Sequence, residues 1–164
     1  PKAATERIIS MGITGDVSIR HNNKSAVFVT DEYEIHTRLV EGNYFKYQQM
    51  FWEMPLNTST NKDEFLNAMV RAKMCMSESS PVKFALSGTA LDISIKDATT
   101  DYCEALSLNA GLAEDMVIGF NARLVVDALK VFDCNNVGIS LGGPKMPMIL
   151  QDGDFKSIVL PVMI

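Results

Sequence analysis

Apolar and polar positions along the chain predict the same order of elements three times, one helix followed by three strands. The first repeat runs from residue 1 to about residue 41. Its helix, "PKAATERIISM", places Ala4, Ile8 and Met11 on one face. Its strands are expected at "DVSIR", "SAVFVT" and "YEIHTRLV", and the alternation in the last predicts a strand with one solvated face.

The second repeat is expected to open with a short apolar strand near residues 50–54. A polar linker, "NTSTNKDEF", follows, in which Asn61 and Glu64 have the spacing of a capping box. The helix after it should run to about Met76, and strands are predicted at "VKFALS", "ALDISI" and "DYCEALSL". The side chains expected to face the core from this helix recur at helical spacing: Phe65, Met69, Ala72 and Met76.

The third repeat is predicted as a strand "MVIGF", a helix "NARLVVDALKVF" and strands "VGISL", "MPMIL" and "FKSIVLP". On its helix we expect Leu124, Ala128 and Val131 to face inward, and Arg123 and Lys130 to face outward. Helices followed by antiparallel strands indicate an α+β fold with the helices on one face of the sheet. Residues 50–164 should form one closed two-helix domain. The first repeat should be half of another, as expected of a fragment.

Composition and charge narrow the class of protein. The 164 residues are 47% hydrophobic and 21% charged, which is typical of a globular chain of one to one and a half domains. The net charge of −5 argues against a broadly cationic surface but permits a local basic face. No run of eighteen apolar residues and no basic-apolar leader is visible, so we expect a cytoplasmic protein without a membrane span.

The residue types that carry catalysis or bind metals are sparse. Cys75, Cys103 and Cys134 are far apart in apolar or strand-like sequence, which favours reduced, buried thiols over disulfides or a metal site. His21 and His36 have no partners at ligand spacing. Since nucleophile, phosphate-loop and dinucleotide motifs are also absent, we expect no enzyme, no cofactor and no metal.

The last seven residues of the chain, 158–164, are all apolar, which is unusual for a free end. We expect them to be the packed end of a core strand, a surface that binds something, or the scar of a cut. Pro161 cannot donate to a sheet, so we expect the chain to leave its last strand near this residue. Leu160, Val162 and Met163 would then be accessible to a ligand.

Three segments, "LVEGNYFKY", "IGFNARLVVDAL" and "IVLPVMI", resemble in their order and spacing the bacterial DNA polymerase III beta subunit, the sliding clamp. The resemblance covers the chain as the second half of the clamp middle domain, 1–49, and the C-terminal domain, 50–164. It implies the DNA-clamp fold and a homodimeric ring of three-domain subunits around duplex DNA. Such a ring catalyses nothing. It tethers the DNA polymerase III alpha subunit, the clamp loader and other clamp-motif proteins.

The resemblance also implies a hydrophobic pocket for short linear motifs of these partners. Carried over residue by residue, its members are Phe45, Gln49, Met50, Asn121, Leu124, Lys145, Pro147, Ile158, Val159, Leu160, Pro161, Val162, Met163 and Ile164. Phe45 and Gln49 depart from the proline and arginine common in the family. Asn121 is equally a good helix N-cap. Without the resemblance, the tail itself reads as core packing.

Two further sets of residues have alternative interpretations. The outward helix faces carry cations that either line the DNA channel or are ordinary solvated side chains: Lys2, Arg7, Arg71, Arg123 and Lys130. Cys75 and Met76 match subunit-contact positions of the family, or belong to the core. The sequence therefore predicts a replication-clamp fragment, and the alternative is a clamp-fold peptide-binding module that does not encircle DNA.

Overall fold

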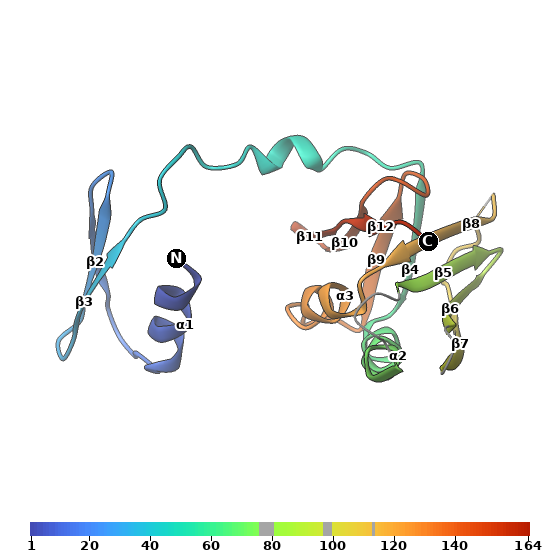
Figure 1. The fold of residues 1–164 in the computed structure, drawn as a ribbon, viewed down its shortest axis with the longest axis horizontal. Coiled ribbons are helices and arrows are strands. Elements are labelled where there is room, and N and C mark those ends of the chain that lie inside the picture. Colours follow the sequence, from blue (N-terminus) through green and yellow to red (C-terminus); the bar gives the residue numbers. More distant parts are fainter. Residues whose placement is uncertain (76–80, 97–99, 113) are drawn as a thin grey trace. The chain divides into compact units, whose positions relative to one another are not determined.

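The computed structural model describes residues 1–75, 81–96, 100–112 and 114–164, which form two compact units (Figure 1). Unit 1 is Pro1–Lys46 and unit 2 is Tyr47–Ile164. The boundary lies three residues before the one expected from the sequence, between residues 49 and 50. No helix in the described part of the chain is both long and apolar enough to cross a bilayer.

Unit 1 contains one helix and a three-stranded antiparallel sheet in the order β1-β2-β3, as predicted for the first repeat. The elements are α1 (Lys2–Ser10), β1 (Ser18–His21), β2 (Ser25–Val29) and β3 (Glu34–Arg38). Ala4, Ile8 and Met11 are half-buried, in agreement with the predicted face of the helix. Of the residues of this unit, all of which the structure describes, only Ala26 is buried, so unit 1 has almost no core of its own.

Unit 2 contains the other two repeats, each with a leading strand before its helix. The first comprises β4 (Leu56–Asn61), α2 (Lys62–Cys75), β5 (Val82–Ser87), β6 (Ala90–Lys96) and β7 (Asp101–Ser107). The second comprises β8 (Met116–Phe120), α3 (Ala122–Leu129), β9 (Asn136–Leu141), β10 (Met148–Asp152) and β11 (Phe155–Val159). A 3₁₀ helix, η1 (Tyr47–Met50), precedes them, and a short strand, β12 (Pro161–Val162), follows. The predicted order of a leading strand, a helix and three strands is confirmed for both repeats, although the first leading strand lies later than predicted and β12 was not predicted.

The two repeats exchange their leading strands. β4 pairs antiparallel with β9 of the other repeat, and β8 pairs antiparallel with β5. The resulting sheets have the orders β11-β10-β9-β4 and β12-β8-β5-β6-β7. Because each sheet contains strands of both repeats, neither repeat can form its sheet without the other.

The helices α2 and α3 lie side by side (Figure 1) and bury their apolar faces in a common core. Phe65 of α2, Phe84 of β5 and Phe120 of β8 pack in series, with ring centroids 5.8 and 5.1 Å apart. The predicted core positions Phe65, Met69 and Ala72 are fully buried. The fourth position, Met76, lies outside the described residues.

The prediction for residues 50–61 is wrong. The strand expected at 50–54 is absent, and β4 lies instead in the polar segment that was expected to be a linker. The hydroxyl groups of Thr58 and Thr60 are buried and donate to the carbonyl oxygens of Ala110 and Ser107, each at 2.8 Å. A threonine whose hydroxyl is satisfied in this way serves as a core residue, which hydrophobic periodicity cannot detect. Asn61 caps α2 as predicted, accepting from the backbone N–H of Glu64 at 3.0 Å.

The predicted inward face of the third helix is also wrong. Leu124 and Val131 are exposed, and the buried residues of α3 are Ala122, Val125, Val126 and Leu129. Ala128 is half-buried against the core. The helix contains so many apolar residues that two faces satisfied the pattern, and the position of the sheets selects one of them.

The three cysteines are free, but the expectation that all are buried is wrong. Cys75 and Cys134 are half-buried, whereas Cys103 is exposed. Cys103 lies in β7, the outermost strand of its sheet, on the face that alternates away from the buried Leu106. Its side chain therefore faces solvent.

The buried Thr60 hydroxyl joins the two sheets of unit 2, since β4 and β7 belong to different sheets. Replacing Thr60 by valine keeps the shape but removes the donor to Ser107. We expect Thr60→Val to lower the free energy of unfolding by about 1–3 kcal/mol, measured by urea denaturation. The exposed Thr89→Val is the control, with an expected change within about 0.5 kcal/mol. Equal stabilities of the two variants would contradict the role given to this hydrogen bond.

Candidate functional site

The C-terminal tail crosses from one sheet of unit 2 to the other. β11 ends at Val159, which is buried and pairs with Met148 of β10. After Leu160 the chain forms β12, in which Pro161 lies opposite Phe120 of β8. The prediction that the chain leaves its last strand near Pro161 is confirmed, while the new pairing with β8 was not predicted. Proline suits this place because β12 is an outermost strand, where a missing N–H costs little.

Gly119 of β8 allows the tail to approach closely. A Cβ atom at this position would lie 2.3 Å from Cγ2 of Ile164 and 2.8 Å from the carbonyl oxygen of Val162. Both distances are shorter than van der Waals contact, so the tail as observed requires glycine. The last residue of the chain is therefore packed against β8 rather than free.

A groove of about 430 Å³ lies along this tail. Its walls are formed by β8, the segment before β10 and the tail: Val117, Pro144, Lys145, Pro161, Val162, Met163 and Ile164. Met163 is 93% exposed; Leu160, a predicted pocket residue, is also exposed but is not part of the groove lining. Lys145 is the one charged residue of this lining. An apolar groove with a single cation at its wall suits an extended peptide with apolar side chains and a nearby carboxylate.

Five of the predicted pocket residues line the groove: Lys145, Pro161, Val162, Met163 and Ile164. Val117 and Pro144 were missed. The alternation of "MVIGF" could have identified Val117, because Met116, Ile118 and Phe120 face the core and leave Val117 on the opposite face. Pro144 gives no comparable signal, since it lies in a loop without periodicity.

The other predicted pocket residues do not line this groove. Pro147 and Val159 are buried, Ile158 is half-buried, and Leu124 is 52% exposed on α3. Asn121 is the N-cap of α3, where its Oδ1 accepts from the backbone N–H of Arg123 at 2.9 Å. Gln49 and Met50 lie in η1, and Phe45 is an exposed residue near the end of unit 1.

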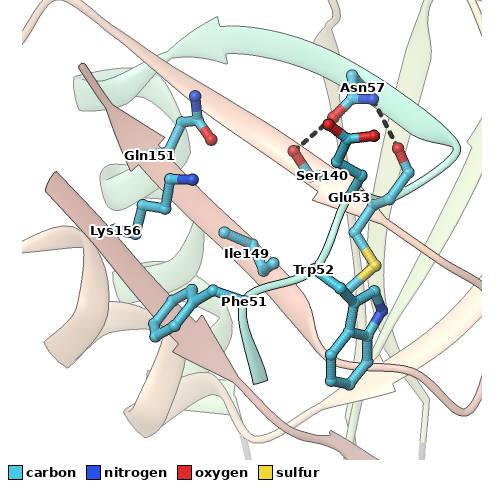
Figure 2. Close-up of a pocket in the computed structure, with 9 residues that line it drawn as sticks. Phe51, Trp52, Glu53, Asn57, Ser140, Ile149, Gln151 and Lys156 are labelled. Atoms are coloured by element: carbon cyan, nitrogen blue, oxygen red, sulfur yellow. Dashed lines mark hydrogen bonds between the residues drawn. The ribbon is translucent and has the colours of Figure 1, made fainter. Parts of the chain in front are cut away.

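A second hollow, of about 330 Å³, lies beside the segment before β4 (Figure 2). Its lining includes Trp52 and Glu53 on one side, and Phe51, Gln151 and Lys156 on the other. The side-chain amide of Asn57 donates to the Met54 carbonyl oxygen at 2.8 Å and accepts from the Ser140 hydroxyl at 2.6 Å; dashed lines mark the bonds of Asn57 in Figure 2. These bonds hold the connecting segment against the sheet. We see no catalytic arrangement in the hollow, and the described residues contain no cluster suited to a metal ion.

The cations predicted to face DNA are all exposed, but they are not equally available. Lys2 and Arg7 lie on α1, Arg123 lies in the first turn of α3, and Lys130 is its C-cap. Lys2 lies 3.5 Å from Glu6, one helical turn away. Arg71 of α2 forms an ion pair with Glu104 of β7.

Arg71 makes a two-pronged ion pair with Glu104, with Nε 2.9 Å from Oε2 and Nη2 2.5 Å from Oε1. The Tyr102 hydroxyl donates to the same carboxylate at 2.6 Å. The hydrogen bonds from Arg71 and then Tyr102 lower the pKa of Glu104. Burial, and next the bond to Glu104, raise the pKa of Tyr102 to about 12. Arg71 thus links α2 to β7. Because the Glu104 carboxylate compensates its positive charge, Arg71 attracts a further anion only weakly.

The predicted subunit-contact residues are only partly described. Cys75 is the last residue of α2 and is half-buried against the core. Met76 lies outside the described residues.

Substitution of Gly119 tests the packing of the tail. We expect Gly119→Ala to lift Val162 and Ile164 from β8, at a cost of about 1–3 kcal/mol for the inserted methyl group. Hydrogen exchange at the tail amides should then accelerate about tenfold or more. Gly111→Ala is the control, because its new Cβ would meet its nearest neighbour, Cγ2 of Thr89, at an ordinary 3.5 Å. Unchanged exchange in Gly119→Ala would show that the tail does not rest on β8.

The ion pair of Glu104 should make stability depend on pH. Because the folded-state pKa lies below the ordinary value of 4.5, the contribution is complete above pH 4.5 and is lost as the pH falls through the folded pKa. We therefore expect the stability difference between wild type and Glu104→Gln to be largest at neutral pH and to shrink in acid. Urea denaturation across this range measures it. A stability difference for Glu104→Gln that stays constant over this range would contradict the assignment.

Known proteins match this chain in sequence and in structure. A family model described as the C-terminal domain of the DNA polymerase III beta subunit matches residues 54–163. The beta sliding clamps of Staphylococcus aureus (strain Mu50) and Staphylococcus epidermidis are each 24% identical over 154 residues, or 90% of this chain. The chain spans only 41% of the length of these curated relatives.

Solved structures agree with this match. A DNA polymerase III beta subunit from Eubacterium rectale has a TM-score of 0.80 at 29% identity, covering 89% of this chain and 41% of its own. The beta subunit from Streptococcus pyogenes has a TM-score of 0.87 at 23% identity, and the Pseudomonas aeruginosa sliding clamp 0.89 at 17%. Both cover the whole chain and 47% of their own. Since the family model covers more than half of its residues, this chain belongs to the DNA polymerase III beta subunit family and has the sliding-clamp fold.

Proposed function

We propose that this chain is part of a DNA sliding clamp, and that its tail groove binds linear motifs of replication and repair proteins. The observation that carries the proposal is the apolar tail, which lies on β8 yet leaves Met163 exposed in the wall of the groove and Leu160 exposed next to Pro161 in sequence. Exposed apolar side chains next to a groove are typical of surfaces that bind a partner. A tail that served only as core packing would bury them.

The extent of the match supports a division into two clamp domains. We infer that residues 50–164 are a clamp C-terminal domain, and that residues 1–49 are the second half of a middle domain. The complete protein would be a homodimeric ring around duplex DNA in the cytoplasm, without catalytic activity. Its partners would be the DNA polymerase III alpha subunit, the clamp loader and other motif-bearing proteins.

Contacts with DNA would be weak and independent of sequence. Lys2, Arg7, Arg123 and Lys130 are exposed on helices and can approach phosphates, while Arg71 is neutralised by Glu104. A few cations on helix surfaces give attraction to the backbone without base readout, as a protein that slides on DNA needs. The acidic net charge of −5 limits that attraction to these faces.

Met163 offers the most direct test of the groove, since its nearly complete exposure means that truncation removes few contacts of the folded chain. Burying such a side chain against a ligand contributes roughly 1.5–3 kcal/mol, so Met163→Ala should weaken peptide binding about tenfold or more. The measurement is fluorescence anisotropy of a labelled peptide that carries the clamp-binding motif of the polymerase alpha subunit.

Val131→Ala is the matched control, because Val131 is also an exposed apolar residue but lies outside the groove. Its affinity for the peptide and the thermal melting of both variants should equal those of the wild type. If Met163→Ala binds the peptide as tightly as Val131→Ala does, the tail groove is not the motif site.

A further inference from the structure

The hollow beside residues 51–54, here called the Trp52 hollow, lies on the face of its sheet that points away from the common core of unit 2. Met148 and Leu150 of β10 belong to that core, so Ile149 and Gln151, which alternate with them, face the other way. Ile149 is nevertheless only 4% exposed, which indicates that residues 51–54 cover it. The segment before β4 is therefore packed on this second face of the sheet.

Three contacts hold this segment in place. Met54 is 5% exposed, and a Cβ atom at Gly142 would lie 2.8 Å from its Sδ, so the glycine leaves the space that the sulfur occupies. The side-chain amide of Asn57 donates to the Met54 carbonyl oxygen and accepts from the Ser140 hydroxyl. Trp52, two residues before this anchor, is nevertheless 43% exposed. The fold thus holds a large aromatic side chain at the surface beside a hollow.

The Trp52 hollow has an acidic side and a basic side. Glu53 lies with Trp52 on one side, and Lys156 lies with Gln151 on the other (Figure 2). Both charged side chains are exposed, and the ion pairs among the described residues include neither of them. An indole ring next to a carboxylate attracts a cation, and an ammonium group next to an amide attracts a carboxylate. The hollow is therefore complementary to a ligand with one charge of each sign.

The charges and the volume of the hollow favour a short peptide over other ligands. Residues 47–164 contain nine Lys and Arg and fourteen Asp and Glu, so their formal charge is −5, which disfavours a phosphate polymer. A wholly apolar peptide would cover Glu53 and Lys156 without pairing either of them. The volume of about 330 Å³ is in the range of small-ligand sites and suits a short segment rather than a folded domain.

We propose that the Trp52 hollow is a second peptide-binding site of unit 2. It takes an extended segment in which a lysine or arginine side chain lies against Trp52 and Glu53, and an aspartate or glutamate side chain pairs with Lys156. The amide of Gln151 beside Lys156 can donate to the same carboxylate. The linings of this hollow and of the tail groove share no residue, so the inference does not depend on the function proposed for the groove.

Fluorescence of Trp52 tests the proposal, because Trp52 is the only tryptophan of the chain and reports on this hollow directly. The probes are Gly-Ser peptides that carry one arginine and one glutamate, separated by one to four residues. For at least one spacing, the full 164-residue chain should show a saturable change in fluorescence. Replacing the arginine or the glutamate of that peptide by glutamine should weaken binding about two- to fivefold, and added salt should weaken it further.

Two substitutions in the chain assign the charges. Glu53→Gln should lose the preference for the arginine peptide over its glutamine analogue while keeping the preference for glutamate, and Lys156→Gln should do the reverse. Glu64→Gln and Lys130→Gln are the matched controls, because both residues are exposed in unit 2, carry the same charges and lie outside the hollow. Both controls should keep the wild-type preferences.

An unchanged Trp52 fluorescence with every peptide would overturn the proposal. Equal affinities for the charged and the neutral peptides, or equal losses of preference in the control variants, would overturn it as well. Tighter binding of a single-stranded oligonucleotide with the same change in fluorescence would show that the hollow takes nucleic acid instead. Because Met163 lies outside the hollow, a failure of the motif-peptide test at the tail groove leaves these results unaffected.

Discussion

The exchange of leading strands between two repeats is the interaction on which unit 2 depends. β4 completes the sheet of the second repeat and β8 that of the first, so both sheets and the shared helix layer must form together. The contacts Phe65 to Phe84 to Phe120 run from a helix through one repeat into the strand donated by the other. Cooperative packing of this kind makes the core a property of the pair.

The tail groove is a consequence of the same exchange. β8 is paired on one side with β5 and would otherwise be the edge of its sheet. The tail covers that edge for two residues, where Gly119 leaves room, and Met163 after them is exposed. An edge covered over so short a length protects the sheet from unwanted pairing while keeping apolar side chains accessible. Structural and binding roles of the tail are thus compatible.

Sequence patterns predicted those elements whose burial follows simple periodicity. The spacing of Phe65, Met69 and Ala72 correctly identified the buried face of α2, on which all three side chains are fully buried. β4 could not be found in this way, since its buried residues are threonines that acquire their hydrogen-bond partners only in the folded state. Similarly, Leu124 was assigned to the core because nothing local to α3 shows which of its apolar faces meets the sheets. The pocket at the tail was predicted from the family resemblance, whereas the pairing of β12 with β8, which depends on long-range packing, was not predicted.

Unit 1 shows what a single repeat lacks when no second repeat packs against it. Its elements follow the predicted order closely, in agreement with the local propensity of these segments for a helix and three strands. Local propensity does not provide a core, because a single repeat has only one layer of apolar side chains to bury. In unit 2 the second layer is supplied by the same chain, and the buried faces of α2 and α3 result from it. The exposure of Ile9 therefore follows from the single apolar layer of unit 1 and not from a weakness of the helix itself.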